Sequence, residues 1–201
     1  MLQSNVQPGD VKYVDVNHDG AINANDKVDL GNGLPKYTFG FNFTLGYKGF
    51  DLSANFTGAA GFQIAQSYRD PSGSQGNYSH RILGRWTGEG TTNEMPRVTY
   101  GDVGNWLFSD LYLQDGDYIR LQNLTLGYDF KKLISWKGLS KLRLYFQVQN
   151  LFTLTKYDGM DPEIGSYNGT DGNSSDSWVS GVDMGYYPHP RTFIVGVNVA
   201  F

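Results

Sequence analysis

A twelve-residue acidic loop carries the clearest chemical signal in the sequence. From Asp15 to Asp26, side chains with oxygen ligands recur at alternate positions, and Gly20 stands sixth. This spacing matches the EF-hand calcium loop, with Asp instead of Glu at the last position. The expected ligands are Asp15, Asn17, Asp19, the backbone carbonyl of Ala21, Asn23 through a water, and Asp26. We therefore predict a structural Ca²⁺ site of weak affinity, roughly 10⁻⁴ to 10⁻³ M. The alternative is a Gly/Asn/Asp turn that holds no ion.

The remaining polar residues do not point to catalysis. The chain has no Cys, and its three histidines are scattered: His18, His80 and His189. Two groups of carboxylates resemble the acid pairs of glycoside hydrolases: Asp115 with Asp117, and Asp158 with Asp161 and Glu163. Both groups stand in glycine-rich junctions between strands and loops, so we expect them to be solvated turn residues. The protein is therefore predicted not to be an enzyme.

Strict alternation of apolar and polar residues dominates the rest of the chain. The run Tyr37–Tyr47 alternates throughout, and a second run over residues 50–57 follows directly after Lys48 and Gly49. Two such runs joined by two residues predict a β-hairpin. Three more runs cover residues 119–130, 142–152 and 192–201. The third run changes parity at Gln122, which predicts a β-bulge there.

One face of these strands is apolar, and the other is rich in Asn, Thr, Gln and Gly. We expect the apolar face to meet lipid through Phe39, Phe41, Phe43, Leu45, Phe50, Leu52, Phe56, Leu124, Leu126, Leu144, Phe146, Val148, Val195, Val197 and Val199. Aromatic residues stand at strand ends, where a membrane girdle would place them: Tyr37, Tyr47, Phe50, Tyr128 and Phe130. A soluble β-sandwich, in which two apolar faces pack together, is the alternative.

The connections between the runs alternate in length, at about 2, 56, 10 and 37 residues. Short turns alternating with long loops are typical of outer-membrane β-barrels, whose long loops lie outside the cell. Five strands cannot close such a barrel. The predicted fold is therefore all-β, with about five C-terminal antiparallel strands of an incomplete transmembrane barrel. Residues 1–36 would form an extracellular segment with the EF-hand-like loop, and residues 37–201 the strands and their loops.

Composition excludes several other classes of protein. The net charge is −4, and no block of five like charges occurs, so we expect no nucleic-acid partner. No apolar stretch approaches the roughly 18 residues of a membrane helix, and no signal sequence follows Met1. Aromatic residues in the long loops would stack on sugars, contact a lid or pack the loops together: Trp86, Trp106, Trp178, Tyr186 and Tyr187.

Several ordered motifs resemble the C-terminal third of SusC/RagA-type TonB-dependent receptors. They are residues 8–20, Arg85-Trp86-Thr87 with Met95-Pro96-Arg97, the strand over residues 115–128, Asn150-Leu151-Phe152, Asp161-Pro162-Glu163 and residues 188–193. Together they span essentially the whole chain.

The resemblance implies a bacterial outer-membrane location in a 22-stranded barrel with an internal plug. Such receptors import oligosaccharides or peptides with a SusD-like surface lipoprotein, and TonB would act through the N-terminal part that this sequence lacks. Phe201 resembles the C-terminal aromatic residue that the barrel assembly machinery reads. The runner-up is a soluble, calcium-stabilised carbohydrate-binding β-sandwich.

Overall fold

The chain divides into two compact units, each built from two separate stretches of sequence. The computed structural model describes residues 3, 5–66, 80–98, 104–164 and 180–201. One unit comprises Met1–Gly31 with Ser67–Tyr112, and the other comprises Asn32–Gln66 with Leu113–Phe201. The helices found among the described residues are short 3-10 turns, and none is long and apolar enough to span a membrane. The predicted division at residue 36 stays a prediction.

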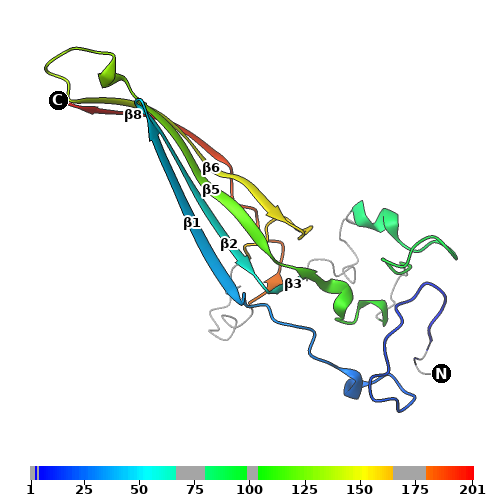
Figure 1. Cartoon of the computed structure of the whole chain (residues 1–201). Coiled ribbons are helices and arrows are strands. Elements are labelled where there is room, and N and C mark those ends of the chain that lie inside the picture. Colours follow the sequence, from blue (N-terminus) through cyan, green and yellow to red (C-terminus); the bar gives the residue numbers. More distant parts are fainter. Residues whose placement is uncertain (1–2, 4, 67–79, 99–103, 165–179) are drawn as a thin grey trace, which may run out of the picture. The chain divides into compact units, whose positions relative to one another are not determined.

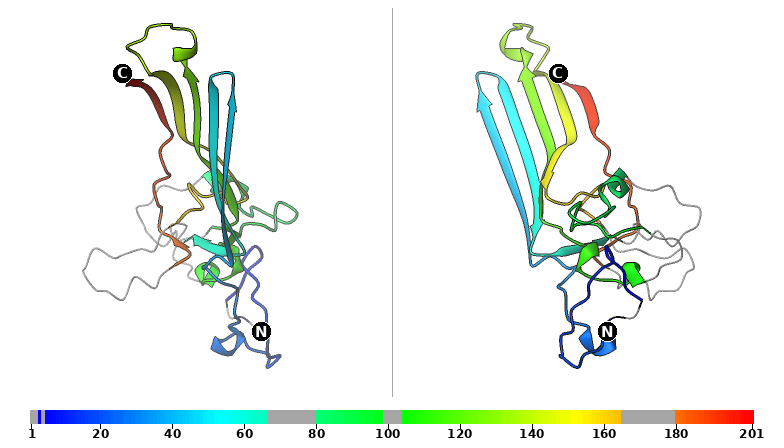
Figure 2. Two further views of the ribbon diagram at one scale, coloured as in Figure 1. Left: turned by 60° about the vertical axis from the view of Figure 1, so that its left-hand side comes forward. Right: turned by 90° about the vertical axis from the view of Figure 1, so that its right-hand side faces the viewer.

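The second unit is dominated by a five-stranded antiparallel sheet (Figure 1). Its strands, in spatial order, are β1 (Tyr37–Tyr47), β2 (Phe50–Ala60), β5 (Tyr118–Asp129), β6 (Lys141–Thr155) and β8 (Thr192–Ala200). Both further views show these strands as a single curved layer (Figure 2). The all-β antiparallel fold predicted from alternation is confirmed. Since β1 and β8 each have one neighbour, the sheet is open at both edges.

The hairpin between β1 and β2 follows from its two turn residues. Lys48 has φ 49° and Gly49 has φ 98°, and Tyr47 pairs with Phe50 across them. Two successive residues with positive φ match the type I′ turn, whose twist suits the flanking strands. The longer β5–β6 connection begins with a 3-10 helix, Phe130–Lys132, whose first turn is capped by the Asp129 carboxylate.

A bulge interrupts β5 where the sequence predicts it. Asn55 of β2 pairs with Asn123, but the next residue, Phe56, pairs with Leu121, so Gln122 is left as the extra residue. The predicted bulge is confirmed. Pairing between β5 and β6 shifts at the same level, where Asn150 has φ 52°. Because of the bulge, Leu121 stays on the apolar face of the sheet.

A second, three-stranded sheet lies at the end of the large sheet opposite the β1–β2 turn. It contains β3 (Gln63–Gln66), β4 (Leu113–Asp115) and β7 (Val182–Asp183) in the order β4-β3-β7. The sequence did not predict these strands. The buried core of the unit lies beside them and consists of Ala59, Phe62, Ile64 and Tyr157.

The first unit is held by a polar cross-link between distant segments. Arg97 contacts the Asp10 carboxylate at 2.5 Å, and the buried Asn105 amide donates to it at 2.8 Å. Burial raises the pKa of Asp10, but the hydrogen bonds from Arg97 and Asn105 outweigh burial and lower this pKa to about 2. Asp10 therefore stays ionised near neutral pH. The Trp86 ring lies directly against Gly9, where a Cβ atom would be 2.3 Å from it.

Candidate functional site

The apolar side chains that were predicted to meet lipid all lie on one face of the five-stranded sheet. Cross-strand pairs such as Phe41–Phe56, Leu124–Val148 and Phe146–Val195 carry this face from β1 to β8. Large side chains on it are exposed, with Phe41 at 57% and Val195 at 71%. Val148 is only 4% exposed and lies in register between Leu124 and Phe193. Contact with lipid remains a prediction that this arrangement suits.

The opposite face is polar, and hydrogen bonds between strands cross it. Asn55 donates to Asn42 at 2.6 Å, and Gln147 donates to Asn123 at 3.2 Å. Amide side chains that bond to one another along a sheet leave further donors and acceptors for water. This face is therefore suited to a wet interior rather than to a second apolar core.

Two glycines on the polar face let larger side chains lie flat on the sheet. Arg143 of β6 reaches across Gly127 of β5 and donates to Asp51 of β2 at 2.7 Å. A Cβ atom at Gly127 would be 2.5 Å from the Arg143 Nε. Gly196 lies under the ring of Tyr145 in the same way. The Arg143 guanidinium also lies over Tyr145, 4.9 Å from the ring centroid.

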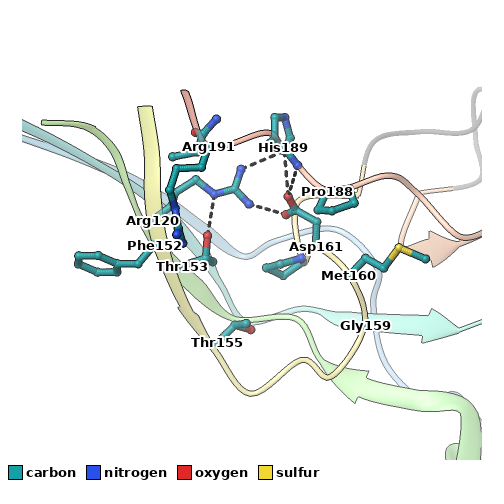
Figure 3. A pocket seen from close by; sticks show the side chains of 12 residues that line it. Arg120, Phe152, Thr153, Thr155, Gly159, Met160, Asp161, Pro188, His189 and Arg191 are labelled. Carbon is teal, nitrogen blue, oxygen red and sulfur yellow. Dashed lines mark hydrogen bonds and ion pairs between the residues drawn. The ribbon is translucent and has the colours of Figure 1, made fainter. Parts of the chain in front are cut away.

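A buried arginine gathers two loops at the end of β5 that leads into the small sheet (Figure 3). Arg120 is 3% exposed and donates to the Thr153 hydroxyl at 2.9 Å and to Glu163 at 2.6 Å. Its third contact is an ion pair with Asp161. The second oxygen of Asp161 accepts from the backbone N–H of His189 at 3.1 Å and lies 2.9 Å from the His189 Nδ1.

Asp161 is the centre of charge in this cluster. Burial raises the pKa of Asp161, but bonds from the His189 side chain and from the backbone N–H groups of Glu163 and His189, together with the charge of Arg120, bring it below its usual value. Asp161 therefore remains a carboxylate that Arg120 neutralises. Its 5% exposure shows that the expectation of a solvated turn residue is wrong at this position. The sequence hint was an arginine enclosed by Ile119 and Leu121 within a strand.

A pocket of about 250 Å³ opens beside this cluster (Figure 3). Its lining includes Thr153, Met160, Asp161, His189 and Arg191. Arg120 and Asp161 both line the pocket, but their charges are paired with each other. The geometry therefore fits loop anchoring better than catalysis.

A second polar cluster fixes the small sheet. The Tyr157 hydroxyl donates to the buried carboxylate of Asp183, which also accepts the backbone N–H of Gly185 at 2.8 Å. Gln66 of β3 donates to Asp158 at 2.9 Å. Asp158 is thus a bonding partner in the loop, and the pairing of Asp158 with Asp161 suggested by the sequence does not form a shared site.

The acidic loop folds back on itself through its own carboxylates. Asp15 accepts the backbone N–H of Gly20 at 2.9 Å, and Asp26 accepts that of Val16 at 2.9 Å. The first and last predicted ligand positions are therefore neighbours. Among the described residues, no group of three or more His, Asp or Glu side chains could hold a metal ion by itself, so a calcium site in this loop also needs its amide and carbonyl oxygens. A hydrogen bond from the Asn17 side chain, followed by one from the Ala21 N–H, lowers the pKa of Asp19, which keeps it anionic.

Comparisons with known proteins give a consistent result. No protein-family model matches the chain. TonB-dependent receptor P3 of Formosa agariphila is 34% identical over 202 residues, which cover 100% of this chain and 20% of the receptor. TonB-dependent receptor SusC of Bacteroides thetaiotaomicron is 27% identical over 205 residues, 100% of this chain and 18% of SusC. A chain in the RagAB peptide importer, in its closed-closed state, shares the fold with a TM-score of 0.67 at 22% identity, over 96% of this chain and 20% of that one.

The chain belongs to the TonB-dependent receptors, and SusC is among its relatives. The resemblance stated from the sequence motifs is thus confirmed. The chain spans about a fifth of the length of the curated receptors it matches. A partial match of this kind accounts for a five-stranded sheet that does not close on itself.

The loop aromatic residues that were predicted to contact a substrate or a lid do not form one cluster among the described residues. Tyr187 is 88% exposed, whereas Tyr186 is half-buried and its N–H donates to Asp183 at 3.1 Å. Trp86 packs against Gly9 in the other unit. Trp178 and the side chain of Trp106 lie outside the described part of the receptor chain. Phe201, the predicted assembly signal, is 83% exposed.

Proposed function

We propose that this chain forms the last strands and the outer loops of a TonB-dependent outer-membrane transporter. The transporter would import oligosaccharides or peptides together with a SusD-like lipoprotein, and it would not be an enzyme. One observation carries this proposal: the five-stranded sheet has one exposed apolar face and one hydrogen-bonded polar face. In support, one structural relative belongs to the RagAB peptide importer, and SusC is a relative by sequence.

The physics of the bilayer supports a larger barrel. Backbone N–H and C=O groups have no water to bind in the hydrocarbon core, so spanning sheets must be closed. The outer edges of β1 and β8 therefore require further strands. The lengths also suit a tilted span of about 9 to 11 residues, since β1 and β2 have 11 residues each and β8 has 9.

The soluble sandwich is disfavoured by the same face. A second sheet would have to cover Phe41 and Val195, yet both stay more than half exposed. A monomeric soluble protein seldom leaves so large an apolar patch in water.

The test is fractionation of the full-length receptor that contains this chain. We expect it in the outer membrane, extractable only with detergent, with a SusD-like lipoprotein co-purifying. TonB deletion should abolish uptake of its oligosaccharide or peptide. Recovery of a monomer from buffer without detergent, with cooperative unfolding, would contradict the proposal and favour the sandwich.

We also propose that the Asp15–Asp26 loop binds calcium with millimolar affinity. The proximity of Asp26 to Val16 closes the loop, and Gly20, with φ 85°, allows its sharp turn. Asp15 and Asp19 would supply oxygen ligands, and the ion would be structural. Isothermal titration of the intact receptor is expected to show binding that Asp19→Asn weakens. An absence of heat at millimolar Ca²⁺ would eliminate the site.

A further inference from the structure

One end of the five-stranded sheet, here called the turn end, consists of residues 47–51 and 128–142, which include the β1–β2 turn and the β5–β6 connection. In this connection, Lys131 Nζ donates to the carbonyl oxygen of Trp136 at 2.7 Å, and Leu139 is buried at 5% exposure. The Ser140 N–H is bonded to the carbonyl of Ala200 at 2.8 Å, which ties the connection to the last strand. The connection is therefore held in a defined shape, and Trp136 projects from it at 60% exposure.

Aromatic rings gather at the turn end from several strands. The rings of Trp136 and Phe201 pack edge to face, with their centroids 6.3 Å apart. On the neighbouring strands, the ring centroids of Phe50 and Tyr128 are 4.5 Å apart, and those of Tyr128 and Phe130 are 4.9 Å apart. These rings continue the apolar face at its border. Trp and Tyr are enriched at this depth in membrane proteins, where the hydrocarbon gives way to headgroups.

The turn end is basic although the whole chain carries a net charge of −4. Residues 47–51 and 128–142 contain five lysines and two aspartates, an excess of three positive charges. Both aspartates are engaged within the protein: Asp51 is paired with Arg143, and Asp129 accepts the N–H of Lys131 at 2.9 Å. Lys48 and Lys137 are exposed, whereas Lys141 pairs with Ala200 on the polar face of the sheet.

We propose that the turn end of the sheet binds the phosphate headgroups of anionic phospholipids. The proposal rests on the proposed function, since it requires the apolar face to lie in a bilayer. The rings fix the depth of the turn end at the interface, and the lysines then lie at the level of the phosphates. A lysine near an anionic membrane surface contributes about 1 kcal/mol, or about fivefold in affinity. The source of the phosphate is a lipid, because the same end of the sheet carries the aromatic rings that border the apolar face.

The experiment uses the full-length receptor purified in detergent. It is equilibrated with equal amounts of phosphatidylglycerol and phosphatidylethanolamine, and native mass spectrometry counts the retained lipids. The wild type should retain phosphatidylglycerol preferentially. The double variant Lys48→Asn and Lys137→Gln should lose this preference by about fivefold for each lysine. Asn suits the positive φ of position 48, so the turn is preserved.

A second double variant is the matched control: Lys12→Gln and Lys27→Gln. These lysines are exposed too, and the same charge is removed from positions outside the turn end. We expect the control to keep the wild-type preference. An equal loss in both variants, or a preference that survives in the first, would overturn the proposal. A receptor that assembles but retains both lipids equally refutes only the lipid site, whereas one recovered without detergent refutes the proposed function.

Discussion

Replacing Val197 with arginine in the full-length receptor is expected to reduce assembly into the outer membrane severely. Val197 lies on the apolar face, pairs with Leu144 and is 56% exposed. An arginine on the lipid face near the midplane of a barrel costs about 2 to 4 kcal/mol. A cost of this size corresponds to roughly a 30- to 900-fold change in the ratio of assembled to unassembled receptor. The fraction that migrates as folded protein in unheated gels measures this ratio.

The neighbouring residue supplies the control. Asn198 follows Val197 in β8 but points to the opposite, polar face, where it pairs with Arg143. Asn198→Arg adds the same side chain on the same strand. Its repulsion with Arg143, which is already paired with Asp51, costs about 1 kcal/mol or less, so we expect a much smaller loss of assembly than for Val197→Arg. If both variants assemble equally well, the apolar face does not meet lipid. If both variants lose assembly equally, β8 tolerates no arginine on either face, and the loss in Val197→Arg is not due to contact with lipid.

The second large effect is expected from Arg120→Met. This change leaves Asp161 buried without its cation, and breaking a buried ion pair from one side typically costs 3 to 5 kcal/mol. The loop segments carrying Asp161 and His189 should detach locally, while the strands remain paired. Hydrogen exchange at the amides of Glu163 and His189, which Asp161 now accepts, would report the detachment.

Arg143→Met is the matched variant for this experiment. Its partner Asp51 is 37% exposed, so solvent can replace the lost cation, and pairs of this kind contribute about 1 kcal/mol or less. Exchange at Glu163 and His189 should be unchanged. In contrast, Asp161→Asn retains an acceptor oxygen for only one of the two amides and removes the buried negative charge, so it should give an intermediate effect. Equal protection of both amides in wild type and Arg120→Met would show that Arg120 does not anchor the loops.

The alternating strands could be read from the sequence because their signal is local. The boundaries of β1 match the prediction at both ends, and β6 extends it only from residues 142–152 to Lys141–Thr155. Gln122 was visible as a bulge because an extra residue reverses the parity of every side chain beyond it. A strand that faces lipid on one side and water on the other displays such patterns clearly.

The small sheet and the Arg120 cluster could not be predicted, because neither has a local signal. β7 has only two residues, too few to show a period, and it pairs with β3 more than a hundred residues earlier. Arg120 meets Asp161 and His189 at sequence separations of 41 and 69 residues. Partners of this kind are selected by the folded chain, so a list of charged residues in sequence order does not reveal them.

The flat side chains on the polar face carry an evolutionary consequence. The Arg143 side chain fills the space that a side chain at Gly127 would need, and the Tyr145 ring does the same at Gly196. A Cβ atom on either glycine would overlap the side chain that covers it. A mutation of the glycine alone is therefore selected against unless the covering residue shrinks. The two residues of each pair should therefore co-vary: receptors that differ at the glycine should also differ at the residue that covers it.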